Sequence, residues 1–305
     1  MTNYQLLTLK DILCLTVIMP NEEFHPQPTA DGSFTFFSTE FNEAFHSQYG
    51  ALQEAERKFV EPTQLQQKAQ QTRLRLLDIC YGLGYNTAAA LATIWQVNPS
   101  CDVEVIGLEA NPNVPQSAIA SKLLQSWCEP IPQLLAQLAS EYQVQTHNLK
   151  ATLIIGDARK TIQKLQRSQF HADAIFLDPF SPPRCPQLWT VEFLQQVALC
   201  LAADGRLATY SCAAAVRTAL ILAKLKIGST SPVGRRSPGT VAAWDSTLPT
   251  LSPEEQQHLL TRAAIPYRDP QLSDSTSVIL QRRQQEQKAS SLMSTSQWRK
   301  HTKIN

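Results

Sequence analysis

Short apolar runs alternate with stretches of helical spacing through the middle of the chain. The first run, at 74–79, leads through two glycines into an alanine-rich helix, and a second apolar run lies at 102–108. Three further strands are predicted at 151–155, 172–177 and 206–211, each followed by a stretch with the periodicity of an amphipathic helix. Because parallel strands need crossover helices, these strand–helix units predict a parallel, doubly wound α/β sheet.

Two apolar segments after the last unit, at 227–231 and 240–244, are predicted to form an antiparallel hairpin. A hairpin added after the fifth strand is typical of class I S-adenosylmethionine-dependent methyltransferases. Near the N-terminus, 34–37 is a short strand candidate and 51–59 has helical spacing. The predicted fold is therefore a Rossmann-like sheet of seven strands with an N-terminal strand-and-helix addition.

These patterns divide the chain into four parts. Residues 1–32 are expected to be disordered or a misassigned extension, with Met19 as the natural start, and 33–71 to cover the substrate and cofactor. Residues 72–245 are the expected methyltransferase domain, and 246–305 a basic, partly disordered extension. Within this extension a helix is expected at 252–264, a strand at 275–280 and a mobile stretch at 281–305.

Composition narrows the classes of function. The 305 residues carry a net charge of +1, so no global positive field indicates a nucleic-acid partner, although 251–305 holds eight basic and five acidic residues. The seven cysteines are odd in number and widely spaced, which argues against a disulfide framework or a zinc site. No apolar run has the length of a membrane span and no signal peptide is recognisable, so a cytoplasmic protein without bound metal is expected.

The glycine turn after the first strand is the first candidate site. Gly82 and Gly84 permit positive φ and close backbone approach, and the free N–H groups of the following helix favour an acceptor-rich ligand. We infer a nucleoside cofactor. The turn alone also suits a dehydrogenase or a plain tight turn, and Thr87 stands where a third glycine would complete the dinucleotide-binding pattern.

Acidic residues stand at or near the carboxyl ends of four successive predicted strands: Asp78, Glu109, Asp157 and Asp178. Parallel strands bring these ends to one edge of the sheet, where open α/β sheets bind ligands. Glu109 follows the glycines at the spacing expected of an acidic residue that accepts hydrogen bonds from ribose hydroxyls.

Taken together, these motifs resemble the methyltransferase domain of the bifunctional tRNA 5-methylaminomethyl-2-thiouridine biosynthesis proteins over about 33–244. The resemblance depends on the order and spacing of short segments: 45–54, Gly82-Leu83-Gly84-Tyr85-Asn86, Leu108-Glu109, Gly156-Asp157-Ala158, 177–182, Leu188-Trp189-Thr190, 208–211 with Arg217, and Gly234-Arg235-Arg236. It implies S-adenosylmethionine as cofactor and, as substrate, the wobble uridine in the anticodon region of tRNA, whose 5-aminomethyl group becomes 5-methylaminomethyl. No FAD-dependent oxidase domain is expected after residue 244, and Pro179 stands where the family commonly has glycine.

Methyl transfer to an amine requires a free lone pair, whereas an alkylamine is largely protonated near neutral pH. Asp178 is the predicted catalytic residue that orients the amine and takes its proton; the alternative is that it only caps the following turn. The expected cofactor contacts are Asp78, Gly82, Gly84, Asn86, Glu109, Asp157 and Ala158. The expected substrate contacts are Phe180 and Trp189, which stack on the base, and Arg184, Arg217, Arg235 and Arg236, which contact phosphates together with Arg282, Arg283, Arg299, Lys300 and Lys303. Trp189 is also a candidate core residue, and a charge run is also compatible with a solvated face.

Two other functions remain open at this point. An aminopropyltransferase of the spermidine synthase type shares the fold and an acidic end of the fourth strand. A non-catalytic tRNA-binding protein is expected to have lost Asp178 or Glu109, and both residues are present here.

Overall fold

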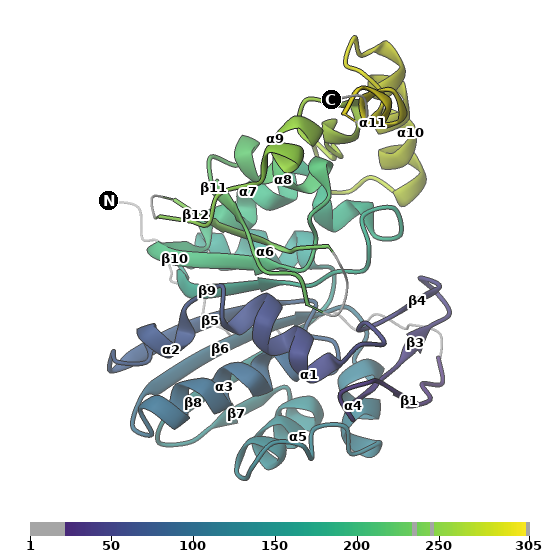
Figure 1. Cartoon of the computed structure of the whole chain (residues 1–305). Helices are drawn as coiled ribbons and strands as arrows, with labels where there is room; N and C mark the ends of the chain where they lie inside the picture. Colours follow the sequence, from purple (N-terminus) through teal and green to yellow (C-terminus); the bar gives the residue numbers. More distant parts are fainter. Residues whose placement is uncertain (1–21, 234–236, 245–246, 303–305) are drawn as a thin grey trace, which may run out of the picture.

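A mixed sheet of eight strands forms the centre of the computed structural model, which describes residues 22–233, 237–244 and 247–302 (Figure 1). In order across the sheet the strands are β11 (Lys226–Ser229), β12 (Thr240–Ala243), β10 (Leu201–Thr209), β9 (Ala172–Leu177), β5 (Arg73–Ile79), β6 (Asp102–Glu109), β8 (Leu149–Ile155) and β7 (Gln143–Gln145). The strands from β10 to β8 are parallel, whereas β11, β12 and β7 pair antiparallel. The chain runs outward from β5 to β8 and then returns to β9, so the strand order reverses between β5 and β9, where such sheets bind ligands.

Helices cover both faces of the sheet, which explains why its strands are apolar on both sides. One face is covered by α3 (Tyr85–Val97), α4 (Asn113–Ala120) and α5 (Ile131–Glu141), and the other by α6 (Ala158–Arg167), α7 (Val191–Leu199) and α8 (Ala214–Leu222). In β5, Leu74 and Leu76 belong to the first core, whereas Leu77 and Ile79 belong to the second. The doubly wound α/β architecture expected from the sequence is confirmed.

The sheet has one strand more than the seven expected. The additional strand is β7, which forms the edge of the sheet and pairs with β8, with Val144 opposite Ala151. Of its three residues only Val144 is buried, so the stretch has too little apolar periodicity to be recognised in the sequence.

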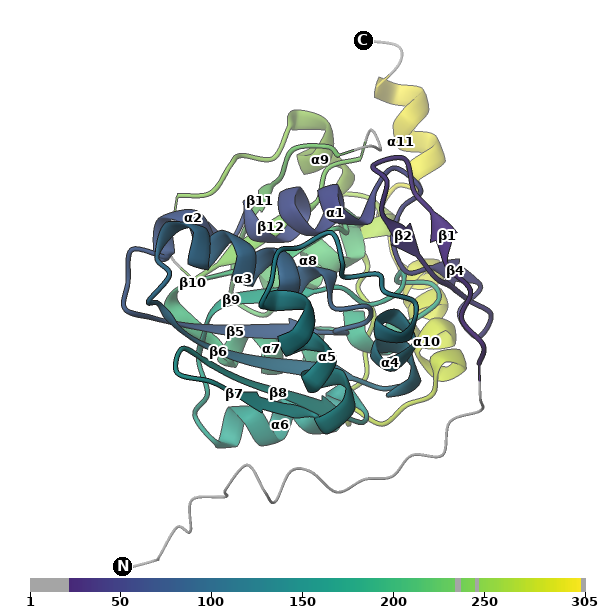
Figure 2. The same cartoon turned by 90° about the horizontal axis from the view of Figure 1, so that it is seen from below.

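The strands of the N-terminal segment lie beyond the carboxyl ends of the parallel strands, whereas its helices pack against α3 on one face of the sheet (Figure 2). It consists of β1 (Gln27–Pro28), β2 (Phe34–Thr35), β3 (Phe37–Ser38), β4 (Glu43–Ala44), α1 (Ala51–Glu54), η2 (Ala55–Val60) and α2 (Leu65–Lys68). The helix expected at 51–59 is confirmed as α1 and η2. The strand expected at 34–37 is divided in two, because Phe36 turns inward and packs against Phe24 and Phe45. The proposed start at Met19 lies outside the described residues.

The C-terminal segment is largely helical, with α9 (Pro253–His258), η4 (Arg262–Ala264), α10 (Thr276–Ala289) and α11 (Thr295–Thr302). The strand expected at 275–280 is wrong: those residues begin α10, and Ile279 packs into the core beside α7 and α8. The stretch expected to be mobile, 281–305, contains the end of α10 and all of α11 in its described part. Over the described residues, none of the helices has the length and apolar content needed to cross a membrane.

Candidate active site

A cavity of about 470 Å³ lies between the N-terminal segment and the carboxyl ends of the parallel strands. The sheet side is lined by residues at or after the ends of β5, β6, β8, β9 and β10: Cys80, Gly82, Leu108, Glu109, Ala110, Gly156, Asp157, Ala158, Arg159, Asp178, Pro179, Phe180, Ser181, Cys185, Gln187, Leu188 and Tyr210. The opposite side is lined by residues of the N-terminal segment: Glu40, Phe41, Glu43, Ala44, Phe45, His46, Ser47 and Glu54. Its volume falls within the ~300–1,000 Å³ typical of small-molecule and cofactor pockets.

The glycine turn forms the floor of this cavity. Gly82 and Gly84 have φ values of 56° and 85°, a region that favours glycine. A Cβ atom on Gly84 would lie 2.7 Å from Tyr81 Oη, so no larger residue fits there without a shift. Gly82 reaches the cavity wall, whereas Gly84 begins α3 and is not among the lining residues.

Glu109 closes the end of β6 and faces the cavity. Its Oε2 accepts a hydrogen bond from the Gly82 N–H and its Oε1 one from the Asn111 N–H, both at 2.9 Å. Burial raises the pKa of the Glu109 carboxyl, against the opposing effect of these backbone donors. Each carboxylate oxygen has a second lone pair, so the group can still accept hydrogen bonds from two hydroxyls of a ligand.

Asp157 and Ala158 follow β8 at the neighbouring part of the cavity. Asp157 caps α6, because its Oδ1 accepts a hydrogen bond from the Arg159 N–H at 2.9 Å. Its carboxylate also pairs with the Arg159 guanidinium, with Nη2 at 2.9 Å from Oδ2. Arg159 itself lines the cavity and was not predicted from the sequence; its second carboxylate partner, Asp269, is 110 residues away in the sequence.

Asp178 lies at the end of β9, where its backbone N–H donates to the Ile79 carbonyl oxygen across the sheet. Its Oδ2 accepts a hydrogen bond from Asn86 Nδ2 at 2.9 Å. Burial raises the pKa of the Asp178 carboxyl well above its usual range, and the nearby charges of Glu54 and Asp78 add to this. Asn86, which the sequence predicts as a cofactor contact, donates this hydrogen bond to Asp178 and is not among the residues that line the cavity.

Asp78 lies beneath the glycine turn and is fully buried, outside the residues that line the cavity. Its Oδ2 accepts a hydrogen bond from Thr87 Oγ1 at 2.7 Å, and among the described residues no donor reaches its Oδ1. Burial raises the pKa of Asp78 to about 7. A buried carboxyl oxygen needs a hydrogen-bond donor, and a water molecule held at the glycine turn can provide it.

Two predicted substrate contacts are wrong. Trp189 is fully buried in the core, and its Nε1 donates to the Phe180 carbonyl oxygen at 2.8 Å, so no base can stack on it. Arg217 is 2% exposed and pairs with Glu255 at 2.8 Å, while its Nε donates to Thr240 Oγ1. It holds α8 to β12 and α9 and is not accessible to a phosphate.

The other predicted substrate contacts are placed as follows. Phe180 lines the cavity and stacks on Phe41, with ring centroids 4.4 Å apart. Arg184 is exposed on the loop after β9. Arg235, Arg236 and Lys303 lie outside the described residues. Arg282 and Arg283 are held within the C-terminal segment, by Asp274 and by the Tyr267 ring respectively.

The N-terminal segment supplies the residues that sequence reasoning missed. Glu43 accepts hydrogen bonds from both the backbone N–H, at 2.9 Å, and the hydroxyl of Ser181, which ties the loop after Asp178 to β4. Glu54 accepts a hydrogen bond from the Ser47 N–H and faces the cavity. His46 lies against Thr35 and Tyr85 and also contributes to the wall of the cavity. No local pattern marks Glu43 as a site residue, whereas Glu54 ends the segment 45–54 of the resemblance without a role assigned to it.

Comparison with known proteins adds an independent observation. Residues 116–245 match a family described as S-adenosyl-L-methionine-dependent methyltransferase. The crystal structure of MnmC2 from Aquifex aeolicus is 33% identical with a TM-score of 0.78, over 89% of this chain and 87% of that one. An uncharacterized protein of Methanocaldococcus jannaschii is 31% identical over 90% of this chain and 76% of its own length. The tRNA 5-methylaminomethyl-2-thiouridine biosynthesis bifunctional protein MnmC of Acidovorax sp. is 31% identical over 61% of this chain, which spans only 30% of that relative.

Proposed function

The chain belongs to the family of S-adenosyl-L-methionine-dependent methyltransferases that includes the methyltransferase region of MnmC, and we propose that it methylates the 5-aminomethyl group of a tRNA wobble uridine. The resemblance, the class I fold and the S-adenosylmethionine cofactor expected from the sequence are thereby confirmed. The acceptor is our proposal. It is supported by the name of the MnmC relatives, whose product carries a methyl group on the aminomethyl nitrogen, and by the acidic wall of the cavity.

The residues at the sheet edge fit S-adenosylmethionine, which supplies a methyl group on a positively charged sulfur when it is bound. We assign Glu109 to the ribose hydroxyls, Asp157 and Ala158 to the adenine, and the backbone at Gly82 to the methionine part. Asp78, buried under the turn with one oxygen that lacks a described donor, is assigned to the methionine amine through a water. The fit depends on the donor and acceptor groups that the cavity presents and on its volume of about 470 Å³.

The proposed acceptor depends on one observation, the burial of the Asp178 carboxylate beside the cavity with a raised pKa. An ammonium group must lose a proton before its nitrogen can form a bond to carbon, and Asp178 is a buried carboxylate whose pKa is raised well above its usual range. A raised pKa makes the carboxylate a stronger base, so it is suited to take that proton directly or through a water. Glu54, whose charge contributes to this rise, provides a second negative group toward the ammonium.

An aromatic wall stands beside Asp178. Phe180 stacks on Phe41 and meets Phe45 edge-on, with centroids 4.4 Å and 5.0 Å apart. Stacking on such a wall stabilises an extruded base by about 1–3 kcal/mol, which offsets part of the cost of taking the wobble base out of the anticodon stack. We therefore assign the uracil ring to this wall, with its aminomethyl group directed to Asp178.

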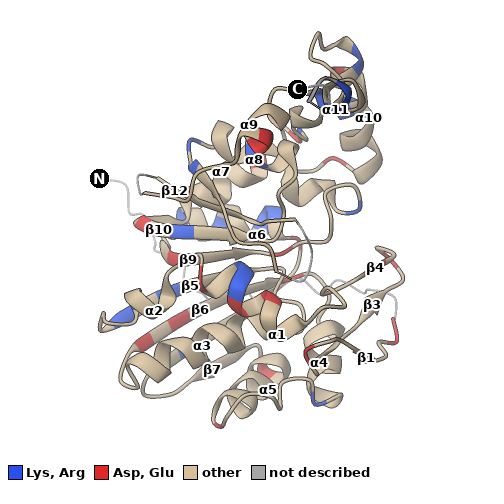
Figure 3. Ribbon diagram, viewed as in Figure 1, with Lys and Arg blue, Asp and Glu red and all other residues tan. Residues whose placement is uncertain are grey.

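Contacts to the tRNA backbone are assigned to exposed basic residues, of which Arg184 on the loop after β9 lies nearest in sequence to Asp178. Lys and Arg positions of the described chain are distributed over several elements and do not gather in one area (Figure 3). Phosphate binding by such a surface depends on several separate contacts, each of which releases counterions and makes the affinity depend on salt.

A methyl-transfer assay tests the proposal. The purified chain is incubated with S-adenosylmethionine and with tRNA that contains 5-aminomethyluridine, and the digested nucleosides are analysed by mass spectrometry. We expect a mass increase of one methyl group on that nucleoside and none in tRNA that is already methylated there. Unchanged 5-aminomethyluridine at saturating cofactor would refute the proposed acceptor.

A polyamine acceptor is the second candidate, because three glutamates of the N-terminal segment line the cavity in addition to Asp178: Glu40, Glu43 and Glu54. Four carboxylates around one cavity can bind the several ammonium groups of a polyamine. The same assay with putrescine and decarboxylated S-adenosylmethionine discriminates the two functions, since only an aminopropyltransferase forms spermidine from them.

A further inference from the structure

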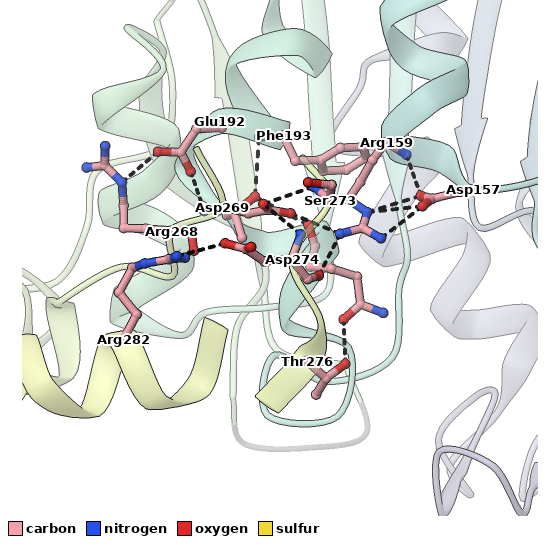
Figure 4. Close-up of polar contacts among 12 residues, drawn as sticks. Asp157, Arg159, Glu192, Phe193, Arg268, Asp269, Ser273, Asp274, Thr276 and Arg282 are labelled. Carbon is pink, nitrogen blue, oxygen red and sulfur yellow. Dashed lines mark hydrogen bonds and ion pairs between the residues drawn. The ribbon is translucent and has the colours of Figure 1, made fainter. Parts of the chain in front are cut away.

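Arg159 connects two carboxylates that are far apart in the sequence (Figure 4). Its Nε and Nη2 donate to the Asp157 carboxylate at 2.9–3.2 Å. Its Nη1 donates to Asp269 Oδ2 and to the Asp274 carbonyl oxygen, both at 2.9 Å. Because a guanidinium is planar with fixed donor directions, holding one edge also sets the position of the other edge and of the carboxylate bound to it.

Asp269 gives Arg159 an immobile partner. It is fully buried, and its Oδ1 accepts hydrogen bonds from the backbone N–H groups of Ser273 and Asp274 at 3.0 and 3.1 Å. Its own backbone N–H donates to Glu192 Oε2 on α7 at 2.8 Å. A buried carboxylate with these partners has one remaining requirement, a cation, and Arg159 meets it.

The segment around Asp269 is itself fastened to the methyltransferase domain. Arg268 pairs with Glu192 at 2.7 Å, and Arg282 of α10 pairs with Asp274 at 2.8 Å (Figure 4). A second link reaches the cavity directly, because Thr276 Oγ1 donates to Gln187 Oε1 at 3.2 Å and Gln187 is a lining residue. The loop 269–274 is therefore held in place next to the cavity and fixes the position of Arg159.

We propose that Arg159 is a positioning residue for Asp157, and that the loop 269–274 thereby determines how strictly the site selects the adenine amino group of the cofactor. A carboxylate held in one place accepts a hydrogen bond from that amino group and repels a carbonyl oxygen in its position. A carboxylate free to rotate away discriminates less between the two. The inference rests on the role proposed above for Asp157 and is independent of the methyl acceptor.

Binding measurements without tRNA test the inference. Dissociation constants are measured by calorimetry for S-adenosylhomocysteine and for S-inosylhomocysteine, in which a carbonyl replaces the adenine amino group. For the unmodified chain we expect a preference of about 10- to 100-fold for the adenosyl ligand, the range of one hydrogen bond to a charged group. In Asp269→Asn the preference should fall by about tenfold, because Arg159 loses its fixed partner.

Arg73→Gln is the matched control, since it removes an ion pair with Glu104 at the amino end of β5, at the opposite end of the strands from Arg159; its preference should equal that of the unmodified chain. Circular dichroism verifies folding, and if Asp269→Asn does not fold, Arg159→Lys replaces it, because a single ammonium cannot bridge both carboxylates as the fork does. An unchanged preference in the folded variant overturns the inference, even where both affinities decrease. So does an unmodified chain that binds the two ligands equally. Failure of the proposed acceptor would instead appear as absent methyl transfer with the preference intact.

Discussion

Replacing Asp178 with asparagine removes the proposed base while leaving the shape of the site almost unchanged. Asn86 Nδ2 donates to Asp178 Oδ2 at 2.9 Å, and the amide oxygen of the variant can accept the same bond. Cofactor affinity should therefore stay near that of the unmodified chain, since the groups assigned to the ribose and adenine follow other strands. The substitution isolates proton transfer from binding.

The expected loss follows from the chemistry of the step. General acid–base catalysis by a positioned side chain contributes about 10²- to 10⁴-fold, so kcat for Asp178→Asn should fall by that factor, equivalent to about 3–5 kcal/mol. The acid limb of the pH profile provides a second signature. Glu54 is among the causes that raise the pKa of Asp178, so Glu54→Gln should lower that pKa and move the limb to lower pH.

The assay combines radiolabelled methyl transfer to tRNA with calorimetric binding of S-adenosylhomocysteine. Two results would contradict the assignment of Asp178 as base. One is a kcat for Asp178→Asn within tenfold of the unmodified chain. The other is a loss of turnover fully explained by lost cofactor affinity, which would make Asp178 a binding residue only.

Three further substitutions test other parts of the structure. Burial raises the pKa of Asp78 from 3.8 to about 7, so the folded state binds this proton more tightly than the unfolded state and loses stability as the pH rises through that interval. The Asp78→Asn variant should therefore have a higher Tm than the unmodified chain at pH 8 but not at pH 4. Equal differences in Tm at both pH values would contradict this. Arg217→Gln should lower the free energy of unfolding by about 3 kcal/mol, because it breaks the pair with Glu255 at a buried position, without changing tRNA affinity; denaturant titration and filter binding measure the two quantities. Arg184→Gln should leave Tm unchanged and reduce the slope of log affinity against log salt by about 1, if this exposed side chain contacts a phosphate; an unaltered slope would exclude that contact.

The local patterns of the chain are sufficient to predict the central sheet and the edge at which the site forms. Apolar residues along 74–79 face both ways because the strand is covered on both faces, and this double burial is visible in the sequence because Leu74 and Leu76 point to one face and Leu77 and Ile79 to the other. The carboxyl ends of parallel strands meet at one edge, so Glu109 and Asp178 were expected together and both line the cavity. These features depend on residues close in sequence, where periodicity and turn chemistry act directly.

Whether a side chain is buried or exposed cannot be predicted from the residues next to it in the sequence. Arg217 and Trp189 have the residue types expected of a phosphate contact and a stacking platform, yet both are buried. Whether an arginine meets solvent or a half-buried glutamate depends on how α8, β12 and α9 pack. The stretch at 275–280 shows the same limitation, since its short apolar run suits a strand or a buried helix until Ile279 has a core to enter.

Local sequence was thus enough for the alternation of strands and helices and for the acidic edge, because hydrophobic period and glycine turns act over a few residues. The enclosure of that edge required the folded chain. Glu43 ties β4 to Ser181 across 138 residues, and Arg159 meets Asp269 across 110. Such pairs arise only when packing brings distant segments together, since the free energy of a buried ion pair or hydrogen bond depends on its surroundings and not on neighbours in sequence.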